Sequence, residues 1–196
     1  VYDLPESFFL RKKTIDEIIA ETPEDPEKVM TAEKAKKLRE YAEKIGIACN
    51  QTHAPYPTAW RGDERYNAFV SEYLKLSIKI SGIMGAKICV VHPCNDYTPE
   101  ENAKMYRNLT ETARESGVKI ALENMWNWNY AKNQAAPAAC SDEDNFARHL
   151  DVLDSDVFVA CLDLGHAEMA GLGTSAVKMI RKLGKRIQAL HIHDNN

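Results

Sequence analysis

Two patterns of apolar and polar residues alternate along the chain, and they predict strands and helices in turn. The strand-type segments are short apolar runs rich in β-branched residues, a pattern typical of strands buried on both faces. The strongest is Val157–Leu162, which reads VFVACL and is followed by Asp163, Gly165 and His166. A carboxylate and an imidazole directly after a buried strand are expected at its carboxyl end, where parallel α/β proteins place their chemistry.

Five strands and six helices are predicted in alternation. The strands are expected over Ile47–Gln51, Ala86–Val91, Val118–Leu122, Val157–Leu162 and Ile187–Leu190. The helices are expected over Thr14–Glu21, Thr31–Ile45, Glu64–Met84, Thr98–Ser116, Ser141–Leu153 and Thr174–Leu183. A loop is expected over Thr22–Lys28, and the Trp- and Asn-rich stretch Met125–Cys140 is expected to be irregular.

Local signals at the ends of the helices support these bounds. Thr98 is a predicted N-cap, with Pro99 at the first helical position and Glu101 three residues after the cap. Glycines directly follow three of the predicted helices, at Gly46, Gly85 and Gly117.

The alternation of strands and helices predicts a parallel sheet with helical crossovers. A (β/α)8 TIM barrel typically needs about 250 residues. The five strands in 196 residues therefore fit a single domain over residues 1–196 that is a TIM barrel incomplete at both ends. A doubly wound open sheet is the alternative, but it would collect its ligand groups at one switch point instead of at every strand end.

Composition narrows the functional classes. The chain is 44% hydrophobic and 28% charged, which is ordinary for a soluble globular protein. No apolar run approaches the roughly 20 residues that span a bilayer. A net charge of −4 makes nucleic acid an unfavourable partner. The five cysteines form no CxxC pair, which indicates a reducing, cytoplasmic setting without a disulfide framework.

A polar side chain of metal-binding or acid–base type follows every predicted strand. In order these residues are His53, His92, Glu123, Asp163 with His166, and His191 with His193. Each alone has an ordinary structural explanation, such as a loop histidine or an ion-paired carboxylate. Because the carboxyl ends of barrel strands converge on one mouth, five such ends together predict a site for a divalent cation.

Other residues carry weaker signals. His149 lies within a predicted helix and is expected to face solvent. Trp126, Trp128 and Tyr130 belong to the irregular stretch and are expected either to cover the barrel mouth or to pack on the barrel.

At the strand ends the chain resembles the xylose isomerase-like TIM barrel superfamily. This superfamily contains sugar and sugar-phosphate isomerases and epimerases, together with the apurinic endonucleases. The matching segments, in the family's order, are THAPY at 52–56, VVHP at 90–93, ALEN at 121–124, CLDLGH at 161–166 and LHIHDN at 190–195. They extend over nearly the whole chain from Gly46 onward.

The resemblance implies a shared metal site. Glu123, Asp163 and His191 would be three ligands of a divalent ion, Mn²⁺, Zn²⁺ or Mg²⁺. A fourth ligand, a Glu on the last strand of the family barrel, is expected beyond Asn196. The first complete strand of this chain would be the third of the family.

The function implied by the resemblance is metal-dependent isomerisation or epimerisation of a sugar or sugar phosphate. Glu123 would transfer the proton next to a carbonyl, through an enediolate. A small-molecule sugar or polyol is the expected partner, and a homo-oligomer is left open. Substrate contacts are expected from His53, His92, His166, Trp126 and His193.

Three other functions stay open. A zinc-dependent apurinic endonuclease would use His53 and His92 as further zinc ligands, although the net charge argues against DNA binding. A dehydratase that acts on inosose-type polyols would begin with the same proton removal as an isomerase. A non-catalytic sugar-binding barrel would bind a ketose without exchanging its carbon-bound hydrogen.

Overall fold

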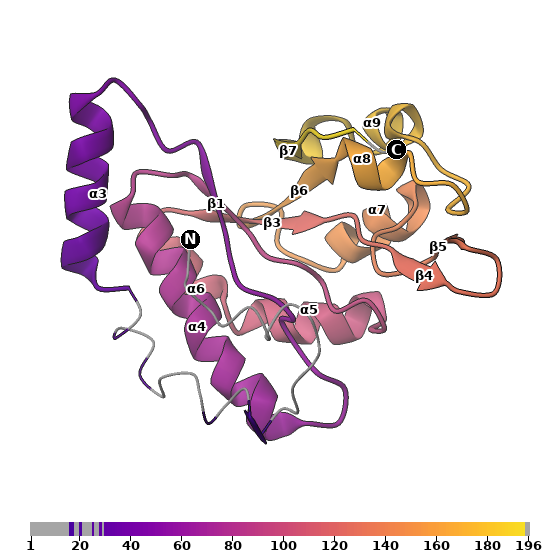
Figure 1. Cartoon of the computed structure of the whole chain (residues 1–196), viewed down its shortest axis with the longest axis horizontal. Helices are drawn as coiled ribbons and strands as arrows, with labels where there is room; N and C mark the ends of the chain where they lie inside the picture. Colours follow the sequence, from indigo (N-terminus) through magenta and orange to yellow (C-terminus); the bar gives the residue numbers. More distant parts are fainter. Residues whose placement is uncertain (1–15, 18–19, 21–24, 26–27, 29, 195–196) are drawn as a thin grey trace.

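A five-stranded parallel sheet forms the centre of the computed structural model, which describes residues 16–17, 20, 25, 28 and 30–194 (Figure 1). Its strands are β1 (Gln51–His53), β2 (Ile88–Val90), β3 (Lys119–Glu123), β6 (Phe158–Asp163) and β7 (Ile187–His191). They lie in the order β1-β2-β3-β6-β7, and every neighbouring pair is parallel. The predicted parallel sheet is confirmed.

The sheet curls, so that its two outer strands approach each other. Gln51 Nε2 of β1 donates to the backbone carbonyl of Leu190 in β7 at 3.2 Å. In a flat sheet the first and fifth strands would lie about 19 Å apart, four spacings of roughly 4.8 Å. The curvature is that of a barrel wall and excludes the open-sheet alternative.

Helices cover the outer face of this wall. They are α3 (Ala32–Lys44), α4 (Glu64–Ile83), α5 (Pro99–Arg107), α6 (Thr110–Ser116), α7 (Glu143–Asp151), α8 (Leu164–Ala167) and α9 (Ala176–Leu183), followed by the 3₁₀ turn η2 (Gly184–Arg186). Figure 1 shows α4, α5 and α6 along one side of the sheet. The predicted capping box of α5 is confirmed, because Thr98 and Glu101 bond each other's backbone N–H. No helix in the described part of the chain is both long and apolar enough to cross a membrane.

The period-two alternation of the strands divides the core into two clusters. Ile120 and Leu122 of β3 face the helices and join the large outer cluster. Ala121, between them, joins an inner cluster with Val159 and Cys161 of β6. The inner faces of β2, β3, β6 and β7 therefore contribute apolar side chains to this cluster.

The first strand begins later than the sequence predicts. A strand over Ile47–Gln51 was expected, but pairing begins at Gln51, opposite Ile88. Ile47 instead closes α3, because its N–H donates to Ala42 O after Gly46 turns the chain with a φ of 76°. A strand forms only where a neighbour offers hydrogen-bond partners, and β2 does not extend that far.

The long helix predicted over Thr98–Ser116 is two helices. Between α5 and α6 the bonds tighten, since Asn108 N donates to Met105 O and Leu109 N donates to Tyr106 O. Both Tyr106 and Leu109 are buried in the outer cluster, and the Tyr106 hydroxyl donates to Val91 O. The break lets two large side chains reach the sheet from one segment.

The stretch Met125–Cys140 is not wholly irregular. It contains an antiparallel hairpin, β4 (Asn127–Asn129) and β5 (Gln134–Ala136). Asn95 Nδ2 donates to Trp126 O and to Asn127 Oδ1, and Ala135 N donates to Ala170 O. The hairpin is therefore tied to the loops at the carboxyl end of the sheet.

Helix α3 keeps an exposed apolar strip. It packs on α4 through the small Ala35, which contacts Leu76 and Ile80. Leu38, Tyr41 and Ile45 are 50%, 62% and 52% exposed. The helix expected over 14–21 and the loop expected over 22–28 lie mostly outside the described residues.

The prediction that His149 faces solvent is wrong, because its side chain is 1% exposed. Its Nδ1–H donates to Asn145 O at 2.9 Å, and Nε2 accepts from Asn102 Nδ2 at 3.2 Å. Both ring nitrogens of the neutral imidazole are satisfied, so burial costs little. Burial lowers the pKa of His149, and the positive charge of Arg148 lowers it further, whereas the Asn145 carbonyl raises it.

This histidine makes stability depend on pH. A histidine whose pKa is lower in the folded state stabilises fully above the unfolded value of about 6.5, and the stability is lost as pH falls below it. We expect urea denaturation to show a loss of up to about 1.4 kcal/mol per pH unit in this window, relative to a His149→Gln variant. Identical pH dependence of the two proteins would contradict the assignment.

Candidate metal centre

The carboxyl ends of the five strands enclose one cavity of about 640 Å³. Its wall includes His53, His92, Glu123, Asp163, His166 and His191 from the strand ends, and Trp126 from the loop before the hairpin. The convergence predicted from the sequence is therefore observed for these seven residues. Glu123, Asp163 and His191 continue the inward-facing series of their strands, whereas His166 reaches the cavity from α8.

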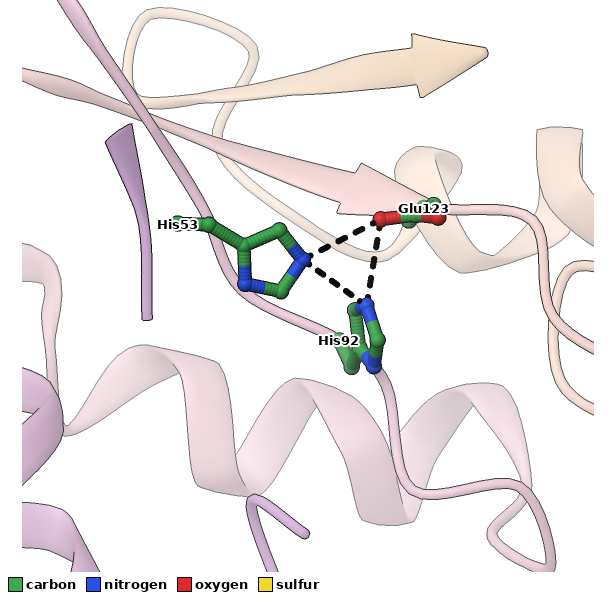
Figure 2. Close-up of side chains that lie close together, drawn as sticks. All are labelled: His53, His92 and Glu123. Atoms are coloured by element: carbon green, nitrogen blue, oxygen red, sulfur yellow. Dashed lines mark hydrogen bonds and ion pairs between the residues drawn. The ribbon is translucent and has the colours of Figure 1, made fainter. Parts of the chain in front are cut away.

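Glu123 is the hub of the site. It ends β3, and its side chain is only 2% exposed. His92 Nε2 lies 3.1 Å from Glu123 Oε2, and His53 Nε2 lies 3.5 Å from the same oxygen. The two histidine Nε2 atoms are themselves 2.9 Å apart, so the three side chains point at a common position (Figure 2).

Asp163 and His191 also lie close to Glu123 or to each other. The two residues are register partners in β6 and β7. His191 Nδ1 lies 3.3 Å from Glu123 Oε2 and 3.7 Å from Asp163 Oδ2. Two carboxylates from different strands thus present oxygens within about 4 Å of one imidazole nitrogen.

Asn124 fixes the relative position of these strands. Its side chain is 1% exposed and bonds both backbone groups of Asp163. Nδ2 donates to Asp163 O at 2.9 Å, and Oδ1 accepts from Asp163 N at 2.8 Å. The amide therefore continues the β3–β6 ladder past the end of β3. Sequence reasoning missed this role, although an amide directly after Glu123 was visible.

His166 follows Asp163 by one turn of α8. Its backbone N–H donates to Asp163 Oδ1 at 2.8 Å, and its Nδ1 donates to Asn124 O at 2.9 Å. A donating Nδ1 leaves the lone pair on Nε2. The imidazole also meets the Trp126 ring edge to face, with centroids 6.2 Å apart.

His193 lies elsewhere than the other predicted residues. It is not among the residues that line the cavity, and its side chain is 46% exposed. Its Nε2 lies 2.9 Å from Asp163 Oδ1 and 3.1 Å from Asp163 Oδ2. The sequence showed a polar residue two positions after His191, but not the direction of its ring.

Two buried carboxylates stay charged because histidines surround them. Burial alone would raise the pKa of Glu123, but hydrogen bonds from His191, His53 and His92 outweigh it and hold that pKa below its usual range. Asp163 behaves alike: burial opposes ionisation, whereas His191 and the His166 N–H hold its pKa low. A buried carboxylate with such partners remains available as a metal ligand.

The histidines respond in opposite directions. Hydrogen bonds to Asp163, Cys161 and Glu123 raise the pKa of His191 to about 12. Burial lowers the pKa of His92, although Glu123 opposes this. The two pKa values shift in opposite directions because His191 lies between two carboxylates, whereas His92 is more deeply buried.

The donor set fits a divalent cation. Zinc binds imidazole nitrogen and carboxylate oxygen at about 2.0–2.2 Å, which places neighbouring ligands roughly 3–4 Å apart. His191 Nδ1 lies at such a distance from one oxygen of Glu123 and one oxygen of Asp163. Among the described residues, three groups have donor atoms close enough together to hold an ion: His53, His92 and Glu123; Glu123, Cys161 and His191; and Asp163, His166 and His193. Nitrogen and carboxylate donors suit zinc or manganese.

Comparison with known proteins places this chain in a family. A family model described as the xylose isomerase-like TIM barrel matches residues 16–196. A curated relative, an uncharacterized protein of Methanocaldococcus jannaschii, is 26% identical over 159 residues, which are 74% of this chain and 50% of that protein. The chain thus spans half of the curated relative that it matches.

Solved structures share the fold. A D-tagatose 3-epimerase-like protein superposes with a TM-score of 0.65 at 22% identity, over 84% of this chain and 62% of that one. The IOLI protein, solved with a bound zinc atom, gives a TM-score of 0.62 at 20% identity, over 81% of this chain and 55% of that one. These structural similarities confirm the predicted TIM-barrel fold. The chain corresponds to part of such a barrel.

Removal of the hub carboxylate tests the metal-binding capacity of the site. We expect Glu123→Gln to raise the Kd for zinc or manganese by at least about 100-fold, because a lost ligand costs more than the 10- to 100-fold typical of outer partners. Competition with a chromophoric chelator measures the change. Glu143→Gln is the matched control, since Glu143 lies on α7 and bonds Thr174. Equal metal affinities of the two variants would refute the site.

Proposed function

The chain belongs to the xylose isomerase-like TIM barrel family, and on this premise we propose that it is a metal-dependent isomerase or epimerase of a sugar or sugar phosphate. The observation that carries the proposal is the approach of Glu123, Asp163 and His191 at one wall of the cavity. These residues would hold a divalent cation, whose role is to polarise a substrate carbonyl.

Glu123 is the proposed proton carrier. Its carboxylate is ionised and almost fully buried, and it opens onto the cavity. A substrate carbon next to a carbonyl would lose its proton to this carboxylate and regain one on the same or the neighbouring carbon. Burial keeps bulk water from competing for the proton.

His166 is proposed to orient the substrate. Asn124 O holds its Nδ1–H, so Nε2 presents a lone pair that can accept a hydrogen bond from a substrate hydroxyl. Asn124 also bonds Asp163, which ties the position of this imidazole to that of the proposed ligand. The two groups would therefore act on one substrate at fixed separation.

Trp126 supplies an apolar wall beside His166. The indole lines the cavity and also meets Trp128 edge to face at 6.1 Å. A flat aromatic face next to polar groups suits the carbon-bound hydrogens of a sugar, whose hydroxyls would reach the histidines. His53 and His92 line the opposite part of the same wall.

One observation supports a second candidate, a zinc-dependent endonuclease. His53 and His92 meet at Glu123 Oε2, which is a donor set for an additional ion (Figure 2). Against this function stands the net charge of −4. Zinc-dependent nicking of DNA that contains abasic sites, without hydrogen exchange in ketoses, would favour it over the isomerase.

Hydrogen exchange tests the proposed chemistry. In deuterated water the metal-loaded protein is expected to exchange the hydrogen next to the carbonyl of a ketose, and a chelator is expected to abolish the exchange. Glu123→Gln should slow exchange by about 100- to 10,000-fold, as loss of an acid–base group does. Glu143→Gln should exchange at the wild-type rate. Undiminished exchange in Glu123→Gln would end the proposal.

The aromatic wall makes a separate prediction. Trp126→Ala should raise KM for the sugar by roughly tenfold, since an aromatic contact contributes about 0.5–1.5 kcal/mol beyond its burial. Tyr130→Ala is the control, because that side chain is 88% exposed and does not line the cavity. Steady-state kinetics with a ketose measure the change in KM. An unchanged KM in Trp126→Ala would show that the indole does not contact the substrate.

A further inference from the structure

We propose that His193 is a positioning residue, which holds the Asp163 carboxylate in the orientation that metal binding needs, and that Gly165 is glycine to admit the His193 ring. The inference rests on the proposed function in one respect, namely that Asp163 is a metal ligand. It differs from the sequence prediction, which assigned His193 to substrate binding.

His193 contacts both oxygens of the Asp163 carboxylate. Its Nε2 lies 2.9 Å from Oδ1 and 3.1 Å from Oδ2. Oδ1 also accepts from His166 N at 2.8 Å, and Oδ2 lies 3.7 Å from both His191 Nδ1 and His166 Nδ1. The His193 imidazole and the His166 N–H together therefore restrain the rotation of the carboxylate, with Oδ2 near the other proposed ligands.

His193 is not among the residues that line the cavity, and its side chain is 46% exposed against 4% for Asp163. Its ring meets that of His166 edge to face, with centroids 5.6 Å apart. A hydrogen bond to a ligating carboxylate is an arrangement that raises metal affinity without contact to the metal itself.

Gly165 is the second, independent observation. A Cβ at this position would lie 2.1 Å from His193 Cε1 and within 2.6 Å of both ring nitrogens. Gly165 is the second residue of the short helix α8, and it is not among the glycines with positive φ. Backbone conformation therefore does not require glycine here, and the three atoms nearest to a Cβ at this position all belong to the His193 imidazole.

His193, Gly165 and Asp163 consequently form one structural unit. Asp163 is the N-cap of α8, and Gly165 lies in the turn that this cap begins. A side chain at 165 would expel the ring, and loss of the ring would free the carboxylate to rotate. Both changes should have the same effect on the metal, although they alter different residues.

Metal affinity of the purified protein tests the idea. His193→Ala should raise the Kd for zinc about 10- to 100-fold, while KM for the sugar at saturating zinc changes less than about twofold. His193→Gln, whose amide can donate to Oδ1, should recover part of the affinity. Ile192→Ala, at the neighbouring exposed position, should bind zinc as the wild type does.

A double-mutant cycle separates positioning from general damage. Gly165→Ala should weaken zinc binding about as much as His193→Ala, and should have no further effect in the His193→Ala background. Additive losses would overturn the proposed unit, as would wild-type zinc affinity in His193→Ala. A raised KM with unchanged zinc affinity would return His193 to substrate binding.

The zinc affinities of the two variants Glu123→Gln and His193→Ala distinguish failure of this inference from failure of the proposed function. If Glu123→Gln abolishes zinc binding and exchange while His193→Ala binds zinc normally, only the inference about His193 fails. If Glu123→Gln binds zinc as tightly as the wild type, the metal centre itself fails, and the role of His193 fails with it.

Discussion

Strand alternation within a curled parallel sheet is the constraint on which this structure depends. Each strand gives alternate residues to the helices and to the inner face, and parallel pairing brings all carboxyl ends to one rim. In β6 the inner series is apolar until its last member, as Val159, Cys161 and Asp163 show. A shift of one residue in any strand would turn its polar end toward the helices, so packing of the core and assembly of the site require the same register.

The site concentrates charge where a protein core tolerates it least. Glu123 and Asp163 are 2% and 3% exposed, and buried carboxylates are costly unless charged or hydrogen-bonding partners compensate them. The compensation comes from histidines on other strands, with His191 between the two carboxylates. Neutral backbone and amide groups, above all Asn124, set the geometry. A cation held by the two carboxylates would take over this compensation.

The sequence predicted the parallel order and the rim residues because both depend on local patterns. The convergence of the strand-end residues on one cavity follows from the strand ends alone, whereas the choice of Glu123, Asp163 and His191 as common ligands came from the family resemblance. Features that depend on distant partners escaped prediction. The start of β1 depends on the length of β2, and the burial of His149 depends on Asn102, 47 positions away. The roles of Gly165 and His193 depend on a ring direction that no spacing encodes.

The most direct test of the account is anomalous diffraction from crystals of the protein grown with zinc or manganese, recorded at the absorption edge of the metal. The account predicts a strong peak in contact with Glu123, Asp163 and His191 together, at the common rim of β3, β6 and β7. A peak that contacts none of these three residues, or no peak at saturating metal, would contradict it.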